Sequence, residues 1–147
     1  MEIQIRSAEE KDLPEVLALV KKLAEYEKAA DQVTAQIEDY IECFRSSLIS
    51  ADLALIDNKV VGCTLYYETF STWRGKMLYL EDFFVLEEHR KKGIGLLLME
   101  AFLKESRDRK CSMVKWQVLD WNEPAISFYK NMGATIEKGR WNVKMIY

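Results

Sequence analysis

The chain has 147 residues, of which 49% are hydrophobic and 31% charged, so it is neither disordered nor low in complexity. A chain of this size usually forms one domain with its own core, and residues 1–147 are predicted to be a single domain. The net charge of -3 argues against a nucleic-acid partner and suits a cationic ligand. No apolar run reaches the roughly 18 residues that span a bilayer, and Met1 to Arg6 lacks the features of a signal peptide. We therefore expect a cytoplasmic protein with no membrane partner.

The cysteines do not indicate a disulfide framework or a zinc site. Cys43, Cys63 and Cys111 are widely spaced, and no C-x-x-C pair is present. A nucleophilic cysteine would need a histidine base, and the one histidine, His89, lies in a basic run. Reduced thiols, no metal and no cysteine catalysis are expected.

The N-terminal third begins with a strand and continues with two helices. Ile3 and Ile5 alternate with polar residues, as in a short strand. In the segment 12–15, Asp12 is predicted to be the helix N-cap, followed by an early proline and a capping-box Glu15. The apolar stripe of this helix consists of Leu13, Val16, Leu17, Val20, Leu23 and Ala24. A second helix is predicted from about Thr34 to Ser46.

The middle of the chain reads as strands. Residues 53–56 and 60–67 are apolar and flank a polar turn at 57–59, which predicts a β-hairpin. The nearly continuous apolar segment 77–85 predicts a central strand buried on both faces. Glu81 and Asp82 interrupt this segment, and ionised groups in a buried strand need a partner or a function.

The last third contains a helix, a strand, a short helix and a final hairpin. A helical apolar pattern starts at Ile94, and a strand is predicted over 113–119. Asn122 is predicted to cap a short helix that Gly133 ends, and 135–147 to form a hairpin. This order of elements predicts an α/β domain whose mixed sheet is covered by helices.

The segment from Arg90 to Gly95 is suited to binding a diphosphate. It lies between a strand and an amphipathic helix, so backbone N–H groups and the helix N-terminus converge on an anion. The glycines let the backbone approach, and the basic side chains add positive charge. The spacing fits neither a dinucleotide fingerprint nor a P-loop, and a basic surface turn before a helix is the alternative.

In this order of elements, R-x-x-G-x-G resembles the acetyl-CoA motif of the GNAT superfamily of N-acetyltransferases. Three further segments resemble its spermidine/spermine acetyltransferase branch, which includes thialysine-acetylating enzymes: Tyr26-Glu27, residues 73–85 and residues 121–134. The early end at Tyr147 and the glutamate-poor stretch Lys28-Ala29-Ala30 depart from that branch.

The resemblance implies the GNAT fold, with a mixed, mostly antiparallel central sheet flanked by helices, and a homodimer. It also implies acetyl-CoA as co-substrate, no metal, and a small cationic amine as acceptor. The implied cofactor-binding residues are Phe84, Val85, Arg90, Lys91, Lys92, Gly93, Ile94, Gly95 and Asn122, the first two through backbone N–H groups near the thioester carbonyl.

The chemistry requires a proton acceptor and a proton donor. An alkylammonium with a pKa of about 10.4 must lose a proton at a cost of roughly 4 kcal/mol near neutral pH. The resemblance assigns this proton to Glu81 through ordered water, and protonation of the departing thiolate to Tyr129. It implies an acceptor pocket formed by Tyr26, Glu27, Trp73 and Asp82. The alternatives are a surface glutamate on a strand for Glu81 and a core aromatic for Tyr129.

Two other functions are also compatible with the sequence. One is a module that binds CoA without catalysis, and the other is an acetyltransferase for protein amino groups. The sequence does not choose between polyamine, thialysine and other diamine-like acceptors.

Overall fold

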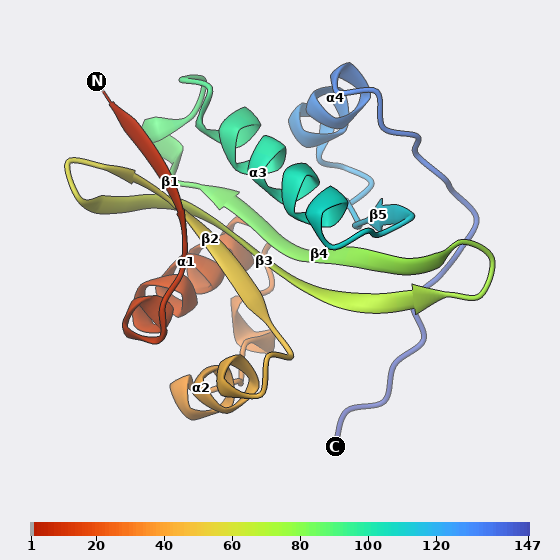
Figure 1. The fold of residues 1–147 in the computed structure, drawn as a ribbon, viewed down its shortest axis with the longest axis horizontal. Coiled ribbons are helices and arrows are strands. Elements are labelled where there is room, and N and C mark those ends of the chain that lie inside the picture. Colours follow the sequence, from red (N-terminus) through yellow and green to blue (C-terminus); the bar gives the residue numbers. More distant parts are fainter. Residues whose placement is uncertain (1) are drawn as a thin grey trace. The chain divides into compact units, whose positions relative to one another are not determined.

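A computed structural model describes residues 2–147, which fall into two compact units (Figure 1). The larger unit extends to Trp116 and the smaller runs from Gln117 to Tyr147. The larger unit contains a five-stranded sheet in the order β1-β2-β3-β4-β5. Its strands are β1 (Ile3–Ser7), β2 (Ser50–Ile56), β3 (Lys59–Ser71), β4 (Gly75–Val85) and β5 (Met113–Lys115).

The sheet is mixed and mostly antiparallel, as predicted. The first four strands pair antiparallel with their neighbours, and β5 runs parallel to β4. The predicted hairpin is β2–β3, where Asp57 and Asn58 both have positive φ values of 51° and 63°. Two such residues form the tight turn that matches the twist of the flanking strands, and Asp and Asn tolerate this conformation.

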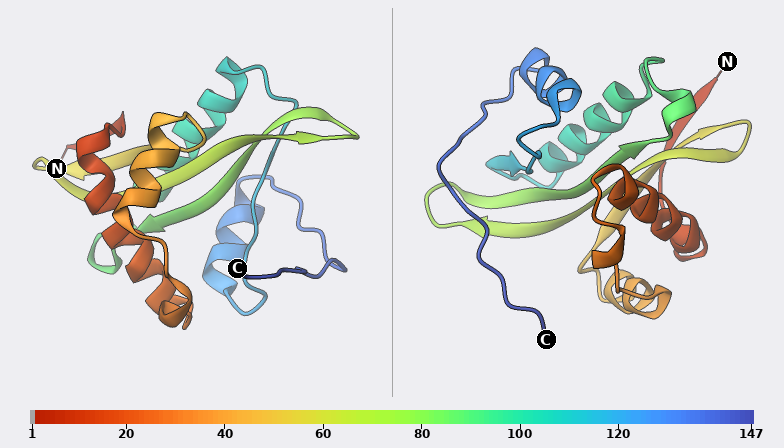
Figure 2. Two further views of the ribbon diagram at one scale, coloured as in Figure 1. Left: turned by 90° about the horizontal axis from the view of Figure 1, so that it is seen from below. Right: turned by 180° about the vertical axis from the view of Figure 1, so that it is seen from behind.

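Helices cover both faces of the sheet. The helices of the larger unit are α1 (Leu13–Tyr26), α2 (Ile37–Arg45) and α3 (Ile94–Asp108), with short 3-10 turns η1 (Glu10–Asp12), η2 (Ala30–Gln32) and η3 (Glu87–His89). One core forms where Val16 and Leu19 of α1 meet Leu53 and Leu65 of the sheet. The opposite core contains the α3 residues Ile94 and Leu98. The view from behind in Figure 2 shows α1 and α2 on the face turned away in Figure 1.

The start of α1 differs from the prediction. Asp12 makes no side-chain cap to α1. Its carboxylate accepts a hydrogen bond from Glu9 N at 2.7 Å and forms an ion pair with Arg6 at 2.8 Å. The capping box therefore belongs to η1, with Glu9 and Asp12 as its two members, and the predicted box with Glu15 is wrong. An ion pair with a strand residue competes successfully for the carboxylate.

One predicted strand is shorter than expected, and the strands predicted at the C-terminal end are absent. The strand predicted over 113–119 ends at Lys115, and residues 135–147 contain no strand. Trp141 and Val143 alternate as in a strand, but they are 93% and 95% exposed. An alternating pattern forms a strand only when a neighbouring strand accepts its hydrogen bonds. The predicted final hairpin is therefore wrong.

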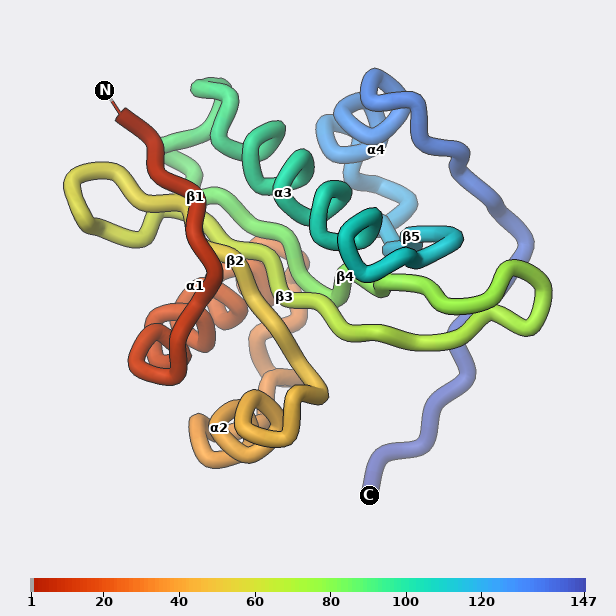
Figure 3. The backbone as a smooth tube through the Cα atoms, viewed as in Figure 1, coloured from red at the N-terminus to blue at the C-terminus, as the bar shows by residue number. Residues whose placement is uncertain are grey.

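Other features of the described chain bear on function. β3 and β4 continue as an arm past Ser50, the first residue of β2, which pairs with Tyr66, and the trace in Figure 3 shows this arm. Near its base, β5 pairs with β4 over residues 77–79. The three cysteines are free thiols, as predicted. Among residues 2–147, no helix combines the length and apolarity needed to cross a bilayer.

Candidate active site

A β-bulge in β4 places two carboxylates on one face of the sheet. Leu65 of β3 pairs with Asp82, but Tyr66 pairs with Leu80, so Glu81 is an extra residue without an opposite partner. Leu65 packs in the core beneath α1, whereas the Tyr66 ring contacts Phe102 of α3 at 5.4 Å. Side chains alternate along a regular strand, and a bulge interrupts this alternation. Glu81 and Asp82 therefore both face the α1 side of the sheet.

The end of α1 brings a third carboxylate to this face. Glu27 is the C-cap, and the helix stops because Lys28 adopts a left-handed conformation with φ 60°. Ala29 N donates to Ala24 O at 2.8 Å and Lys28 N to Glu25 O at 3.0 Å, which is the Schellman pattern. Glu27 is half-buried, and burial raises the pKa of its carboxyl group.

Glu27, Glu81 and Asp82 form what we call the carboxylate cluster. Burial, followed by the charges of Glu81 and Glu27, raises the pKa of Asp82 to about 7. None of the ion pairs among residues 2–147 includes any of the three. Because like charges close together disfavour ionisation unless a cation joins them, the cluster is a suitable site for an ammonium group.

Three tyrosines border the carboxylate cluster. The Tyr67 hydroxyl donates to Glu81 Oε1 at 3.1 Å, and the Tyr67 and Tyr79 rings stack with centroids 5.4 Å apart. Burial, then the negative charge of Asp82, raises the pKa of Tyr40 on α2 to about 12. The tyrosines are thus neutral hydroxyl donors with aromatic faces. Sequence reasoning missed them, because only strand register and helix packing bring them to the cluster.

The segment 90–95 forms the expected turn before α3. Lys91 and Gly93 have φ values of 62° and 83°, and Gly93 is the N-cap of α3 without a side-chain cap. The first helical hydrogen bond runs from Leu97 N to Gly93 O at 3.2 Å, so the preceding amides have no acceptor within the helix. Lys91 and Lys92 are exposed, whereas Ile94 is buried. The turn offers backbone N–H groups and positive charge to an anion.

β4 has an open edge beside this turn. β5 pairs with β4 only as far as Tyr79. Leu86 N donates to Val61 O at 2.9 Å, which directs that amide toward β3. Since amides alternate in direction along a strand, the N–H of Phe84 also faces β3, and that of Val85 faces the open edge. Of the two predicted backbone donors, Val85 has the orientation that a ligand on this edge requires.

The Arg90 side chain extends from the 90–95 turn to the face of the sheet that carries the carboxylate cluster. Its Nε donates to Val85 O at 2.9 Å, and its guanidinium lies over the rings of Tyr26 and Phe84, with centroid distances of 5.0 and 5.3 Å. The residues Tyr26, Glu27, Glu81 and Asp82 and the turn at 90–95 therefore meet at one end of the sheet.

Trp73 does not join this group within one chain. It lies in the turn between β3 and β4, 84% exposed, at the tip of the arm. The strand from Gly75 to Asp82 spans about 20 Å at roughly 3.3 Å per residue. Trp73 therefore lies too far along the arm to contact the cluster of its own chain.

The smaller unit carries two predicted site residues on α4 and its cap. α4 is Glu123–Asn131, and Asn122 Oδ1 accepts a hydrogen bond from Ala125 N at 3.4 Å, which confirms the predicted cap. Gly133, with φ 91°, ends the helix as predicted. Tyr129 is 8% exposed, and its ring meets that of Phe128 edge to face at 5.8 Å.

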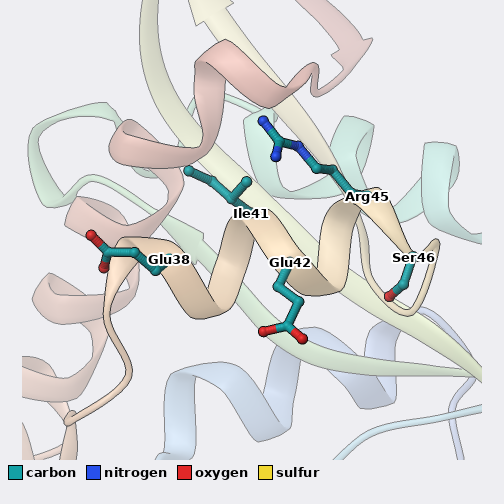
Figure 4. Close-up of a pocket in the computed structure, with 5 residues that line it drawn as sticks. All are labelled: Glu38, Ile41, Glu42, Arg45 and Ser46. Carbon is teal, nitrogen blue, oxygen red and sulfur yellow. The ribbon is translucent and has the colours of Figure 1, made fainter.

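A surface hollow of about 610 Å³ lies elsewhere, on α2. Figure 4 shows its lining side chains, which project from that helix and, at its C-terminal end, from the cap residue: Glu38, Ile41, Glu42, Arg45 and Ser46. Arg45 is held by Glu10 at 2.6 Å, and none of the five is a predicted site residue. No group of three or more side chains suited to a metal ion occurs among the described residues.

The arrangement of sheet, bulge and glycine-containing turn is that of an acetyltransferase. The chain matches the acetyltransferase (GNAT) family model over residues 13–134 and belongs to that family, whose members use acetyl-CoA. It is an N-acetyltransferase, which confirms the predicted family, fold and enzyme class.

Individual relatives refine this result. The chain is 37% identical over 142 residues to thialysine N-epsilon-acetyltransferase of Bos taurus, covering 90% of this chain and 84% of that protein. It is 32% identical over 140 residues to spermidine/spermine N(1)-acetyltransferase-like protein 1 of Homo sapiens, and the match covers 89% of this chain and 20% of that protein. The structure of an aminoglycoside acetyltransferase from an uncultured soil metagenomic sample has a TM-score of 0.83 at 20% identity, covers 99% of this chain and 100% of that chain, and shares the fold.

Proposed function

We propose that this enzyme acetylates a primary amine of a small cationic metabolite: a diamine, a polyamine or a thialysine-like amino acid. The observation that carries the proposal is the carboxylate cluster, in which three acidic side chains face one side of the sheet and none takes part in an ion pair among residues 2–147. An acceptor with two ammonium groups suits this cluster. One group loses its proton and reacts, and the other remains charged beside a carboxylate.

In the proposed reaction, both substrates are bound together and the amine attacks the thioester directly. Glu81 receives the ammonium proton through a water molecule, and Tyr67 holds the Glu81 carboxylate by its hydroxyl hydrogen bond. The free amine forms a bond to the carbonyl carbon while the carbon–sulfur bond breaks, and the nitrogen then releases its second proton to solvent to give the neutral amide. The N–H of Val85 on the open edge of β4 stabilises the negative charge on the carbonyl oxygen.

The diphosphate of acetyl-CoA is proposed to bind the amides that follow Gly93 and the charges of Lys91 and Lys92. Tyr129 is proposed to give its hydroxyl proton to the departing thiolate, and Asn122 to contact the CoA arm in addition to capping α4. Both roles rest on the family resemblance of residues 121–134. Proton transfer by a positioned side chain typically contributes 10²- to 10⁴-fold to a rate.

We also propose that the protein acts as a cytoplasmic homodimer. Phe70 and Trp73 at the arm tip are 69% and 84% exposed, and exposed apolar groups of this kind mark interaction surfaces. A second copy would allow the Trp73 of one chain to serve the acceptor site of the other. Light scattering of wild type and Trp73→Ser tests this: a monomeric wild type contradicts it.

The enzymatic proposal is tested with a panel of amines and acetyl-CoA, following release of free thiol. A diamine or thialysine should give a higher kcat/KM than a monoamine of equal length. The double variant Glu27→Gln with Asp82→Asn should reduce this preference by about 1 to 3 kcal/mol, the value of a charge-assisted hydrogen bond. Glu25→Gln, two residues before Glu27 and exposed on α1, is the matched control.

Equal kcat/KM values across the panel would refute the two-charge acceptor while leaving acetyl transfer itself intact. Binding of acetyl-CoA without turnover of any amine would favour a CoA-binding module. Turnover of peptide amino groups alone would favour a protein acetyltransferase.

A further inference from the structure

Arg90 belongs to the cofactor turn by sequence, yet its side chain is engaged with the acceptor side of the enzyme. Nε donates to Val85 O at 2.9 Å, which fixes the guanidinium plane against the end of β4. The cationic carbon lies 5.0 Å from the centre of the Tyr26 ring and 5.3 Å from that of Phe84. Both distances fall within the range of favourable cation–π contacts.

Each partner of Arg90 is close in the chain to a member of the carboxylate cluster. Tyr26 directly precedes Glu27 at the end of α1, and Phe84 follows Asp82 by two residues in β4. Phe84 and Asp82 also lie on the same face of the strand, since side chains alternate beyond the bulge. The guanidinium therefore connects the end of α1 to the strand that carries the other two carboxylates.

We propose that Arg90 is a positioning residue for the amine acceptor: it holds the end of α1 against β4 and so sets the spacing of Glu27 from Glu81 and Asp82. The inference rests on the proposed function, because it assigns the acceptor to the carboxylate cluster. It differs from the role expected from the sequence, in which Arg90 adds charge to the phosphate site.

The backbone of the turn links this contact to the co-substrate. Lys91 and Gly93, with φ values of 62° and 83°, shape the turn that gathers the amides, and Arg90 immediately precedes them. A ligand that orders the turn also orders the Arg90 side chain and, through Tyr26, the position of Glu27. Binding of acetyl-CoA and binding of the amine should then strengthen each other, and such coupling is reciprocal.

Arginine is needed for this role. Its planar guanidinium donates from Nε while its faces contact aromatic rings, and a lysine ammonium has neither the plane nor the Nε–H. Arg90→Lys keeps the positive charge but removes the geometry. Arg90→Gln removes both. Lys92→Gln is the matched control, because it removes one charge from an exposed side chain of the same turn.

The experiment measures the KM of a diamine at saturating acetyl-CoA and the Kd of acetyl-CoA by calorimetry. Arg90→Lys and Arg90→Gln should both raise the amine KM about 10-fold, equivalent to about 1.4 kcal/mol, while Arg90→Lys retains the wild-type Kd for acetyl-CoA. Lys92→Gln should weaken acetyl-CoA and leave the amine KM unchanged. Adding Arg90→Gln to Tyr26→Leu should raise the amine KM by less than the single changes combined, because the two residues share one contact.

The opposite pattern would overturn the inference. If Arg90→Lys behaves as wild type and Arg90→Gln matches Lys92→Gln, Arg90 acts only through its charge on the phosphates. Thermal unfolding of each variant identifies a folding defect, and Arg90→Lys, the milder change, then decides the question. A wild-type enzyme that acetylates no amine would refute the proposed function itself, a result separate from an active enzyme whose Arg90 variants keep the wild-type amine KM.

Discussion

Substituting Asp82 by asparagine should change how the stability of the enzyme depends on pH. Burial, with the charges of Glu81 and Glu27, raises the pKa of Asp82 from its ordinary value of 3.8 to about 7. In the unfolded chain the carboxyl ionises near pH 4, whereas in the folded protein it keeps its proton up to about pH 7. Between these values the folded state binds one more proton, so its stability falls as pH rises, by about 1.4 kcal/mol per pH unit.

The magnitude follows from this difference. The full pKa shift of Asp82 corresponds to a change of at most about 4 kcal/mol in the free energy of unfolding. Water beside the exposed Glu81 screens the charges and makes this change smaller. Asparagine is neutral at every pH and nearly isosteric with the protonated acid. The variant and the wild type should therefore be similarly stable below about pH 4, and the advantage of the variant should grow by about 2 to 3 kcal/mol between pH 5 and pH 8.

Urea unfolding of both proteins at half-unit steps from pH 5 to pH 8 measures the effect. Other carboxyl groups titrate in the same range, so the difference between the two proteins is the quantity to plot. Asp57→Asn, in the exposed β2–β3 turn, is the control for the removal of one carboxylate. A constant difference between wild type and Asp82→Asn across this range would refute the raised pKa of Asp82.

Kinetics provide an independent measurement of the same group. An ionised Asp82 attracts an ammonium, so the wild-type KM for a diamine should rise as pH falls through about 7. The KM of Asp82→Asn should be high and should lack this inflection. An inflection of equal size in the variant would assign the titration to a different group.

Three further changes address the remaining parts of the enzyme. Tyr129→Phe should lower kcat about 100-fold or more with acetyl-CoA affinity nearly intact by calorimetry, and wild-type turnover would return Tyr129 to a purely structural role. Gly93→Asp places a side chain and a negative charge at an N-cap with φ 83°, and should weaken acetyl-CoA at least 10-fold or so; unchanged affinity would remove the phosphate site from this turn. Lys110→Gly relieves a left-handed residue with φ 61° after α3 and should add about 0.5 to 1 kcal/mol to the unfolding free energy in urea, whereas equal midpoints for Lys110→Gly and Lys110→Ala would contradict this.

Features set by near neighbours in the chain were predictable from the sequence. The Asp57-Asn58 turn, the cap at Asn122 and the stop at Gly133 depend on a few adjacent residues, and the structure confirms all three. The glycine-containing turn before α3 was located for the same reason, since its backbone shape follows from its own residues.

Features that depend on distant partners were not predictable. Asp12 was expected to cap a helix, but Arg6 from β1 takes its carboxylate. The contact between Arg90 and Tyr26 joins residues far apart in the chain, and nothing local to either indicates it. Residues 135–147 alternate as a strand does, yet strand formation requires a partner that local pattern cannot supply.

The carboxylate cluster has one feature that the local sequence predicts and one that depends on strand pairing. The interruption of an apolar strand by Glu81 and Asp82 was visible in the sequence, and it indicated a functional site. Their shared orientation was not visible, because regular alternation would place consecutive side chains on opposite faces. Only the pairing of Leu65 with Asp82 and Tyr66 with Leu80 reveals it.

The bulge at Glu81 also limits which insertions and deletions β4 can tolerate. Deleting that one codon would restore a regular ladder between β3 and β4 but bring Asp82 directly after Leu80, so one acidic group would be lost and a single carboxylate would remain on the strand. Inserting a codon between Leu80 and Asp82 would turn every later side chain of β4 over, moving Phe84 out of its core and Val85 away from the open edge. Hairpin tips and loops tolerate insertions and deletions, whereas this position in the middle of a strand does not. The enzyme therefore depends on the residue count of β4 as much as on the identity of its residues.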